Sequence, residues 1–218
     1  MDKIVKFDTL SYTIDKKRGK SMYEKLVSRL ESAPARKYVV REAENLADEV
    51  LEICGHVGKS APTPIVKIAN DFKFKTYKVH NIPDDISGNI FIGGTTSDIY
   101  GSDKVIIVGD GETLPHQRFI VAHELAHYLM DYIGNPEYSD SRTLFTRTYP
   151  KVNHSSSEEI RADRFAAELL MPKMVFLAEY VKAMKLSDYD KDYAIPYLAK
   201  TFGTKESSIQ RRIQEVLE

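Results

Sequence analysis

The amino-acid sequence predicts an α+β protein, in which several helices pack on a small, mainly antiparallel sheet of three strands and further helices follow at the C-terminal end. Two observations favour this class. Helical periodicity of apolar residues fills the first third of the chain and its last half, and three short β-prone runs with turn-rich connections lie between them. With 218 residues, of which 42% are hydrophobic and 29% charged, the chain is long enough to bury one core.

Three helices are expected before the sheet, after a loose N-terminal arm that ends near Lys20. The first helix starts near Ser21 and stops before Pro34. The second carries one apolar stripe and is ended by glycines, and Thr63 is the expected N-cap of the third, with Pro64 in its first turn. The expected ranges are residues 21–33, 36–56 and 63–72.

The three strands are expected where the periodicity changes. FKFKTYKV (72–79) alternates apolar and polar residues, GNIFIGG (88–94) is bounded by glycines, and KVIIVGDG (104–111) is an apolar run closed by a turn. The polar stretch 134–154 is long enough to be a functional loop. Later helices are expected over residues 114–133, 156–170, 173–184 and 204–217.

Composition and charge narrow the classes of function. The 31 basic and 32 acidic side chains give a net charge of -1, which argues against attachment of the whole protein to nucleic acid or to an anionic membrane. A single cysteine, Cys54, excludes an intramolecular disulfide and a cysteine-based zinc cluster. No apolar run approaches the ~18 residues that span a bilayer, and the N-terminus does not read as a signal peptide. A cytoplasmic protein is therefore expected.

The stretch RFIVAHELAHYLM contains the pattern His123-Glu124-x-x-His127 on a predicted helix. Residues four apart share one helix face, so the two imidazoles can bind one ion, while Glu124 can act on a water molecule as general base. This pattern is typical of zinc proteases. The alternative is structural, with two buried histidines and a solvated glutamate on an amphipathic helix.

A catalytic zinc needs three protein ligands and one open position, so a third ligand is required. Glu159, on the helix expected at 156–170, is the candidate, and Asp163 one turn later can accept the outer N–H of a ligand histidine. Glu158 and His154 are the alternatives. Glu159 could instead be the carboxylate of a capping box with Ser156, but an equivalent box is available one residue earlier.

Two motifs together resemble the ImmA/IrrE family of metallo-endopeptidases. The first runs from Arg118-Phe119 into Ala122-His123-Glu124-Leu125-Ala126-His127. The second is Glu159-x-x-Ala162-Asp163-x-Phe165-Ala166-x-x-Leu169-Leu170-Met171-Pro172. Weaker similarity extends the resemblance to about residues 35–217. One departure is Ala126, where the family commonly has glycine.

The resemblance implies a zincin-like fold and a zinc-dependent endopeptidase of the gluzincin type. Its metal ligands would be His123, His127 and Glu159, its general base Glu124, and Asp163 the carboxylate behind a ligand. One catalytic Zn²⁺ is the implied cofactor. The implied substrate is a protein, such as a helix-turn-helix regulator of a phage, mobile element or stress response. Residues 1–34 would form an arm and short helix, and residues 35–218 the metallopeptidase domain with its C-terminal helical element.

Two further details are expected for such an enzyme. A second group besides zinc usually stabilises the oxyanion, and His154, Tyr149 and Tyr128 are the candidates. An extended substrate is expected to pair with a sheet edge, and the GNIFIGG strand with Ile90 and Ile92 is the hypothesised edge.

Two other classes of function are kept as alternatives. One is a non-catalytic protein-binding or antitoxin-like component of a two-gene system, for which Glu124 would have no use. The other is a DNA contact through KKRGK (16–20) and the C-terminal stretch 195–218, with Lys200, Lys205, Arg211 and Arg212, where 198–213 has a weak helix-turn-helix pattern. The complete pair of motifs favours the enzyme.

Overall fold

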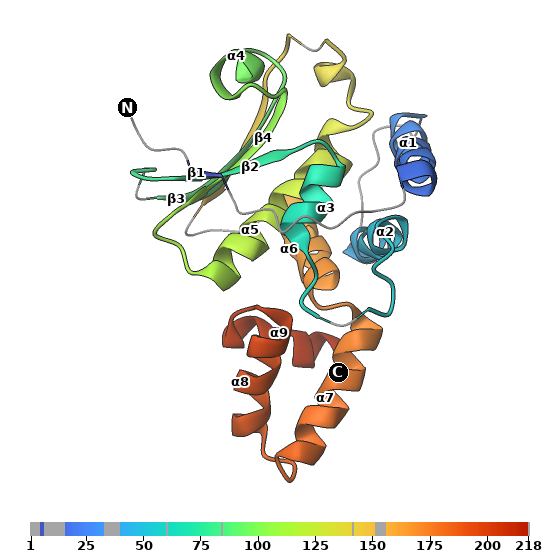
Figure 1. Ribbon diagram of the computed structural model, residues 1–218, viewed down its shortest axis with the longest axis vertical. Helices are drawn as coiled ribbons and strands as arrows, with labels where there is room; N and C mark the ends of the chain where they lie inside the picture. Colours follow the sequence, from blue (N-terminus) through green and yellow to red (C-terminus); the bar gives the residue numbers. More distant parts are fainter. Residues whose placement is uncertain are drawn as a thin grey trace.

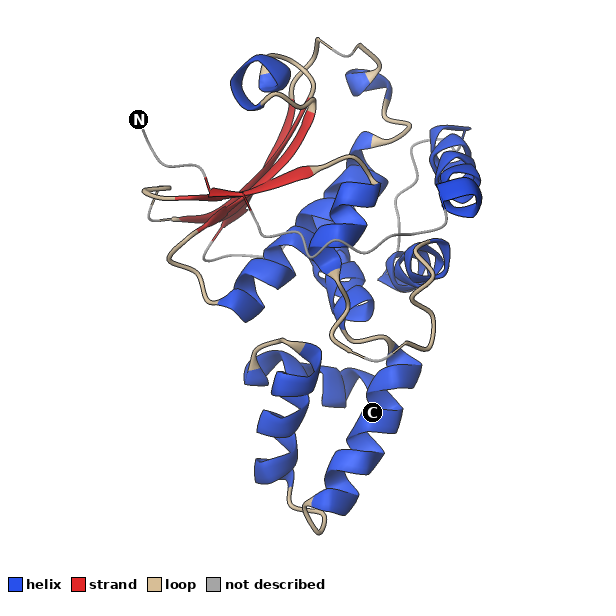
Figure 2. Cartoon of the chain, in the orientation of Figure 1, coloured by secondary structure: helices blue, strands red, loops and turns tan. Residues whose placement is uncertain are grey.

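The computed structural model describes residues 5–6, 16–32, 40–59, 61–83, 85–140, 142–150 and 156–217. It confirms the α+β class: helices lie against a twisted sheet, and a group of three helices follows at the C-terminal end (Figures 1 and 2). No described helix has the length and apolar character needed to span a membrane.

The sheet is mainly antiparallel, as expected, but it is larger than expected. It has five described strands in the order β1-β2-β4-β3-β5, and the pair β2–β4 is parallel while the other pairs are antiparallel. The expected number of three strands is therefore wrong. The bounds are β1 (Val5–Lys6), β2 (Lys75–Val79), β3 (Ile86–Ile92), β4 (Lys104–Gly109) and β5 (Phe145–Pro150).

Strand β5 lies inside the stretch 134–154 that was expected to be a loop. Its inner face buries Phe145 and Tyr149, but the residues between them are exposed and polar. The apolar alternation is therefore too sparse to identify the strand from the sequence. Because β5 pairs with β3, β3 lies between β4 and β5. The hypothesis that the GNIFIGG strand is a sheet edge is wrong: among the described strands the two edges are β1 and β5.

The expected helices before and beside the sheet are present with shifted ends. They are α1 (Lys16–Ser32), α2 (Val40–Ile53), α3 (Ile65–Asp71) and, unexpectedly, a short α4 (Thr96–Tyr100). Helix α1 begins within the expected arm, because lysine and arginine are good helix formers even without apolar periodicity. Thr63 does not cap α3: the N-cap residue is Pro64, with no side-chain hydrogen bond. Instead the Thr63 carbonyl accepts a hydrogen bond from Arg118, at 2.8 Å.

The two motif helices are α5 (Leu114–His127) and α6 (Ser157–Leu170), and a π-helical turn, Tyr128–Tyr132, extends α5. Alanines line the contact between α5 and α6, where Ala122, Ala126, Ala162 and Ala166 are fully buried. Small side chains allow the two backbones to approach closely. Helices α3 and α5 pack on the sheet, and α2 packs on α6 (Figure 1).

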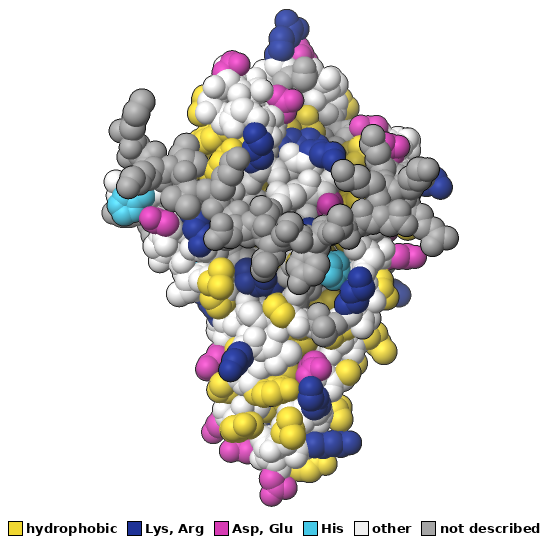
Figure 3. Space-filling view, in the orientation of Figure 1, with side chains coloured by type: hydrophobic (Ala, Val, Ile, Leu, Met, Phe, Trp, Pro, Cys, Tyr) yellow, Lys and Arg dark blue, Asp and Glu magenta, His cyan; other side chains and the backbone are white. Residues whose placement is uncertain are grey.

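The C-terminal group consists of α7 (Lys173–Leu186), α8 (Lys191–Phe202) and α9 (Glu206–Leu217). Helix α8 lies between the expected helices 173–184 and 204–217, where no helix was expected, and Pro196 is inside it. Arg118 on α5 donates a hydrogen bond to the Gly203 carbonyl, at 3.1 Å, and so ties the turn between α8 and α9 to the motif helix. Charged side chains of both signs and apolar side chains are interspersed on the visible face of this group (Figure 3).

The predicted boundary between residues 1–34 and 35–218 stays a prediction. Leu26 and Leu30 on α1 are each only 2% exposed and belong to the same core cluster as α2 and α5.

Candidate metal centre

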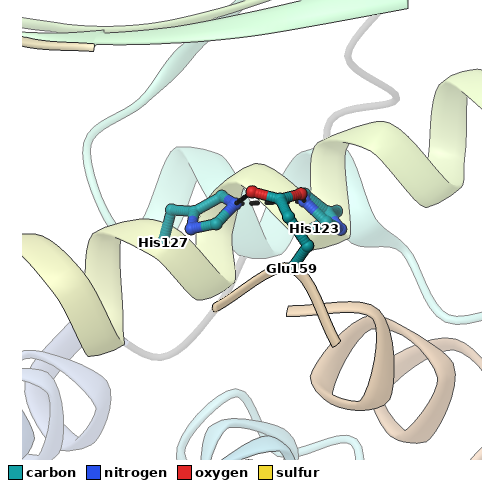
Figure 4. Close-up of side chains that lie close together, drawn as sticks. All are labelled: His123, His127 and Glu159. Atoms are coloured by element: carbon teal, nitrogen blue, oxygen red, sulfur yellow. Dashed lines mark hydrogen bonds and ion pairs between the residues drawn. The ribbon is translucent and has the colours of Figure 1, made fainter. Parts of the chain in front are cut away.

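The structure brings together the three residues that the sequence predicts as metal ligands. His123 and His127 lie one turn apart on α5, and Glu159 comes from the first turn of α6 (Figure 4). The two Nε2 atoms are 3.0 Å apart, and the Glu159 carboxylate oxygens lie 2.9 Å from Nε2 of His123 and 3.3 Å from Nε2 of His127. Among the described residues, this is the one group with the spacing of a metal site.

A carboxylate stands behind each histidine. Nδ1 of His123 lies 2.9 Å from Oδ1 of Asp163, and Nδ1 of His127 lies 2.5 Å from Oδ2 of Asp131. If both Nδ1 atoms donate to these carboxylates, both Nε2 lone pairs point into the centre. Asp163 is therefore placed as expected, whereas the sequence analysis missed Asp131.

The sequence spacing could have identified Asp131, since His127 and Asp131 are four residues apart on a continuous helical pattern. The carboxylate lies in the π-helical turn that follows α5. Arg161 on α6 also lies 3.7 Å from Asp131, so this carboxylate is held from both motif helices.

The donor set fits a divalent cation such as zinc. Two imidazole nitrogens and one carboxylate are the ligands of one class of catalytic zinc sites. The charge balance points the same way: burial lowers the pKa of His127, but the hydrogen bonds to Asp131 and Glu159 outweigh it and raise that pKa to about 10. Burial raises the pKa of Glu159, yet its two histidine contacts lower it well below the usual range. These shifts favour a protonated His127 beside an ionised Glu159, so positive charge in the centre is stabilised.

Glu124 is not among the converging ligands, and its carboxylate is the least satisfied group in the centre. The residue is 0% exposed, and neither of its oxygens has a hydrogen-bond partner among the residues that the structure describes. Burial raises its pKa to about 7. A buried polar group without a partner costs free energy, so such a group in a folded protein indicates a missing ligand or a catalytic role.

The alternatives for the third ligand are partly resolved. Ser156 does cap α6, because its Oγ accepts from the backbone N–H of Glu159 at 3.3 Å, but the Glu159 side chain still faces the histidines. The Glu158 carboxylate accepts a hydrogen bond from Ser157 and is 41% exposed, away from the centre. His154 lies outside the described residues.

The structure also distinguishes between the candidates for stabilising an oxyanion. Tyr128 is wrong for this role: its hydroxyl lies 2.5 Å from Nζ of Lys104 and its ring packs on Phe74, among residues of the core. Tyr149 lies at the end of β5 with its ring edge-on to His123, 4.7 Å between centroids. Burial raises the pKa of Tyr149, and so do the neighbouring carboxylates of the centre, which keeps the phenol protonated and able to donate.

Three polar residues that the sequence analysis missed, His116, Glu112 and Ser87, form a linked group next to Tyr149. The ring of His116 is edge-on to Tyr149 at 5.6 Å, and its Nδ1 lies 2.6 Å from the Glu112 carboxylate. Ser87 donates a hydrogen bond to the same carboxylate, also at 2.6 Å. His116 lies on the same face of α5 as His123, two turns earlier, which is the spacing that could have identified it.

Comparison with known proteins agrees with this geometry. The model of the Peptidase_M78 family, described as the IrrE N-terminal-like domain, matches residues 86–214, a range that includes α5, α6 and the residues of the centre. Searches of curated proteins and of solved structures gave no significant match. Because the family match covers more than half of the chain, the protein belongs to the ImmA/IrrE family, a family of metallopeptidases.

Proposed function

We propose that the protein is a zinc-dependent endopeptidase that hydrolyses a peptide bond in a protein substrate. His123, His127 and Glu159 are the proposed zinc ligands, and Glu124 is the proposed general base. The observation that carries this proposal is the buried, unpartnered carboxylate of Glu124 beside three converging donors. A purely structural metal site would need the three donors but not this glutamate.

In the proposed mechanism, bound zinc would supply a Lewis acid that polarises the scissile carbonyl and acidifies a water molecule. Glu124 takes the proton from the attacking water and passes it to the leaving amine, for which a carboxylate with a pKa near 7 is well matched. Asp163 and Asp131 hold Nδ1 of the two histidines, so the imidazoles keep one orientation.

Tyr149 is the proposed oxyanion donor, and the edge strand β5 is the proposed docking edge for an extended substrate. Both follow from position: β5 is an edge of the described sheet, and its last part carries Tyr149 to the ring of His123. Tyr149→Phe is expected to lower kcat by about 10²-fold while zinc content stays unchanged. Unchanged kcat would remove Tyr149 from the mechanism.

The proposed substrate class is a regulator with a helix-turn-helix fold, from a phage, mobile element or stress response. This part rests on the family alone. The competing DNA-binding function is weakened by two contacts of α9: Arg212 is 2% exposed and forms a salt bridge with Glu168, and Arg211 donates a hydrogen bond to Glu215. The Arg212 guanidinium is therefore not available to contact phosphate, whereas Arg211 is 55% exposed and is held by its salt bridge with Glu215.

The experiment that tests the function is cleavage of a proteome-derived peptide library by zinc-loaded protein, with new termini mapped by mass spectrometry. Wild type is expected to cut, and Glu124→Gln to cut about 10²–10⁴-fold more slowly with its zinc retained. Equal cleavage by both proteins would mean that Glu124 is not the base. Zinc binding without cleavage of peptides or of candidate regulators would favour the non-catalytic binding function.

A further inference from the structure

Arg147 lies in the middle of the edge strand β5, on the face of the sheet that is turned toward α5. The strand register identifies this face: Arg147 pairs directly with Ile90 of β3, and Tyr149 pairs with Gly88. Directly paired residues of antiparallel strands carry their side chains on the same face. A Cβ atom added at Gly88 would clash with the side chain of Ile120 on α5. Arg147 is therefore on the side of the sheet that looks onto the motif helix.

Two observations place Arg147 close to the metal centre. Tyr149, whose ring centroid is 4.7 Å from that of His123, follows Arg147 on the same face of the strand, two steps of ~3.3 Å further along. The charge of Arg147 also reaches Glu124: burial raises the pKa of Glu124 to about 7, while the two histidines and Arg147 act in the opposite direction. The arginine therefore lies beside the proposed general base and the proposed oxyanion donor.

The Arg147 side chain is exposed, and no hydrogen bond or salt bridge joins its guanidinium to a residue that the structure describes. Its Cζ lies 5.9 Å from the centroid of the Phe145 ring. By contrast, Arg161 on α6 is buried and lies 3.7 Å from Asp131. Because Phe145 and Tyr149 are buried, the alternation of the strand would place an apolar residue between them. The strand instead carries an accessible positive charge there.

A substrate strand paired with the outer side of β5 would bring one of its residues directly opposite Arg147. Directly opposed residues have Cβ atoms about 4.5–5.5 Å apart and share a face, so this substrate side chain would also point toward α5. Opposite charges in such a pair are favourable and like charges are unfavourable. A carboxylate, in addition, can accept two parallel hydrogen bonds from a guanidinium.

We propose that Arg147 is a specificity residue that binds an aspartate or glutamate side chain of the substrate, two residues away from the substrate residue opposite Tyr149. This inference rests on the proposed function, with β5 as its docking edge, and adds the side-chain class that the site selects. The acidic residue lies toward the C-terminus of the substrate if the substrate runs antiparallel to β5, and toward its N-terminus if it runs parallel.

The test reverses the charge of the strand. Zinc-loaded wild type, Arg147→Glu and Arg142→Glu are given the same peptide library, and the cut sites are mapped. Wild type is expected to favour acidic over basic residues by about 5-fold at one fixed position near the cut. Arg147→Glu should favour basic residues at that same position. Arg142→Glu makes the same change at an 89% exposed side chain before β5 and should keep the wild-type profile.

A second measurement separates binding from turnover. The peptide that wild type cuts best is titrated calorimetrically into zinc-loaded Glu124→Gln, beside the same peptide with lysine in place of its acidic residue. The acidic peptide is expected to bind about 5-fold more tightly, and adding Arg147→Glu should invert this order. The difference should shrink in 1 M salt, where the Debye length is only about 3 Å.

Two results would overturn the assignment of Arg147 while leaving the protease intact. One is a cleavage profile without an acidic preference, which is expected if an inward-facing charge serves only to keep the strand edge from pairing with other chains. The other is an acidic preference that persists in Arg147→Glu. Failure of the proposed function has a different signature: zinc-loaded wild type cuts no peptide at all, and the assignment of Arg147 then falls with it.

Discussion

Helix α6 carries two clusters of buried polar groups, and they differ in how well their atoms are paired. At its C-terminal end, one carboxylate oxygen of Glu168 accepts the backbone N–H of Lys173 at 2.7 Å, and the other forms a salt bridge with Arg212. The Arg212 Nε donates to the Met171 carbonyl at 3.1 Å. In this paired cluster both carboxylate oxygens of Glu168 have partners, and the contacts of Arg212 fix α9 to the end of α6.

At the N-terminal end of the same helix, Glu159 and Asp163 meet the two histidines of α5, and the neighbouring Glu124 has no partner among the described residues. Burial alone therefore does not distinguish a functional cluster from a structural one. The pairing of the buried glutamate does: both oxygens of Glu168 have partners, whereas neither oxygen of Glu124 has one among the described residues, and the proposed metal centre is complete only with a cation and a reacting group.

The largest effect on stability is expected in the paired cluster. Arg212→Met leaves Glu168 buried without its counter-charge, so the free energy of unfolding should fall by about 3–5 kcal/mol in urea denaturation. Zinc content should not change. The control is Arg142→Met, which removes an 89% exposed partner of Asp140 and is expected to leave stability nearly unchanged. Equal effects of the two variants would contradict the distinction between the clusters.

Removal of zinc should lower the thermal stability of the protein through the metal centre and not through the paired cluster. With free zinc about 1,000-fold above its Kd, binding contributes about 4 kcal/mol, so a chelator should lower Tm by roughly 8–16 °C. Adding zinc back should restore it. If the chelator leaves Tm unchanged although zinc is bound beforehand, the centre does not couple metal binding to the fold.

The Glu124 carboxylate should lower the free energy of unfolding of the metal-free protein. Burial raises its pKa from 4.5 to about 7, so the folded state holds the proton more tightly than the unfolded chain, and stability is lost as the pH rises from 4.5 through 7. Glu124→Gln should therefore stabilise the metal-free protein above pH 7 by up to about 3 kcal/mol, with the gain vanishing toward pH 4.5. Destabilisation at all pH values would show that Glu124 has a structural partner.

The smallest effect is expected from the carboxylates behind the histidines. Asp163→Asn and Asp131→Asn keep a hydrogen-bond acceptor near each Nδ1 but remove its charge, so zinc affinity should fall by about 10–100-fold in competition with a chromophoric chelator. Asp140→Asn, on the exposed loop, is the matched control and should bind zinc as wild type does.

The residues of the centre could be predicted from the sequence because helical spacing fixes which side chains share a face. His123, His127 and Glu159 come together as predicted, on two helices that the sequence predicts. Asp131 was missed although it lies four residues after His127 within the expected helix 114–133, which in the structure ends in a π-helical turn.

The errors in the fold have similar local causes. Strand β5 has polar residues on its outer face and only two apolar residues facing inward, so it resembles a loop. Helix α8 was not expected from the sequence, and in the structure it contains Pro196. Strand order is also a tertiary property: pairing with β5 places β3 inside the sheet, and nothing in the GNIFIGG sequence itself specifies this.

The most direct test measures zinc per chain by elemental mass spectrometry in wild type, Glu159→Gln and Glu168→Gln. Both variants change one buried glutamate of α6 to its neutral isostere, one in each cluster. We expect about one zinc per chain in wild type and in Glu168→Gln, and none in Glu159→Gln. Retention of zinc by Glu159→Gln, or a wild type that purifies and reconstitutes without zinc, would contradict the assignment of the metal centre.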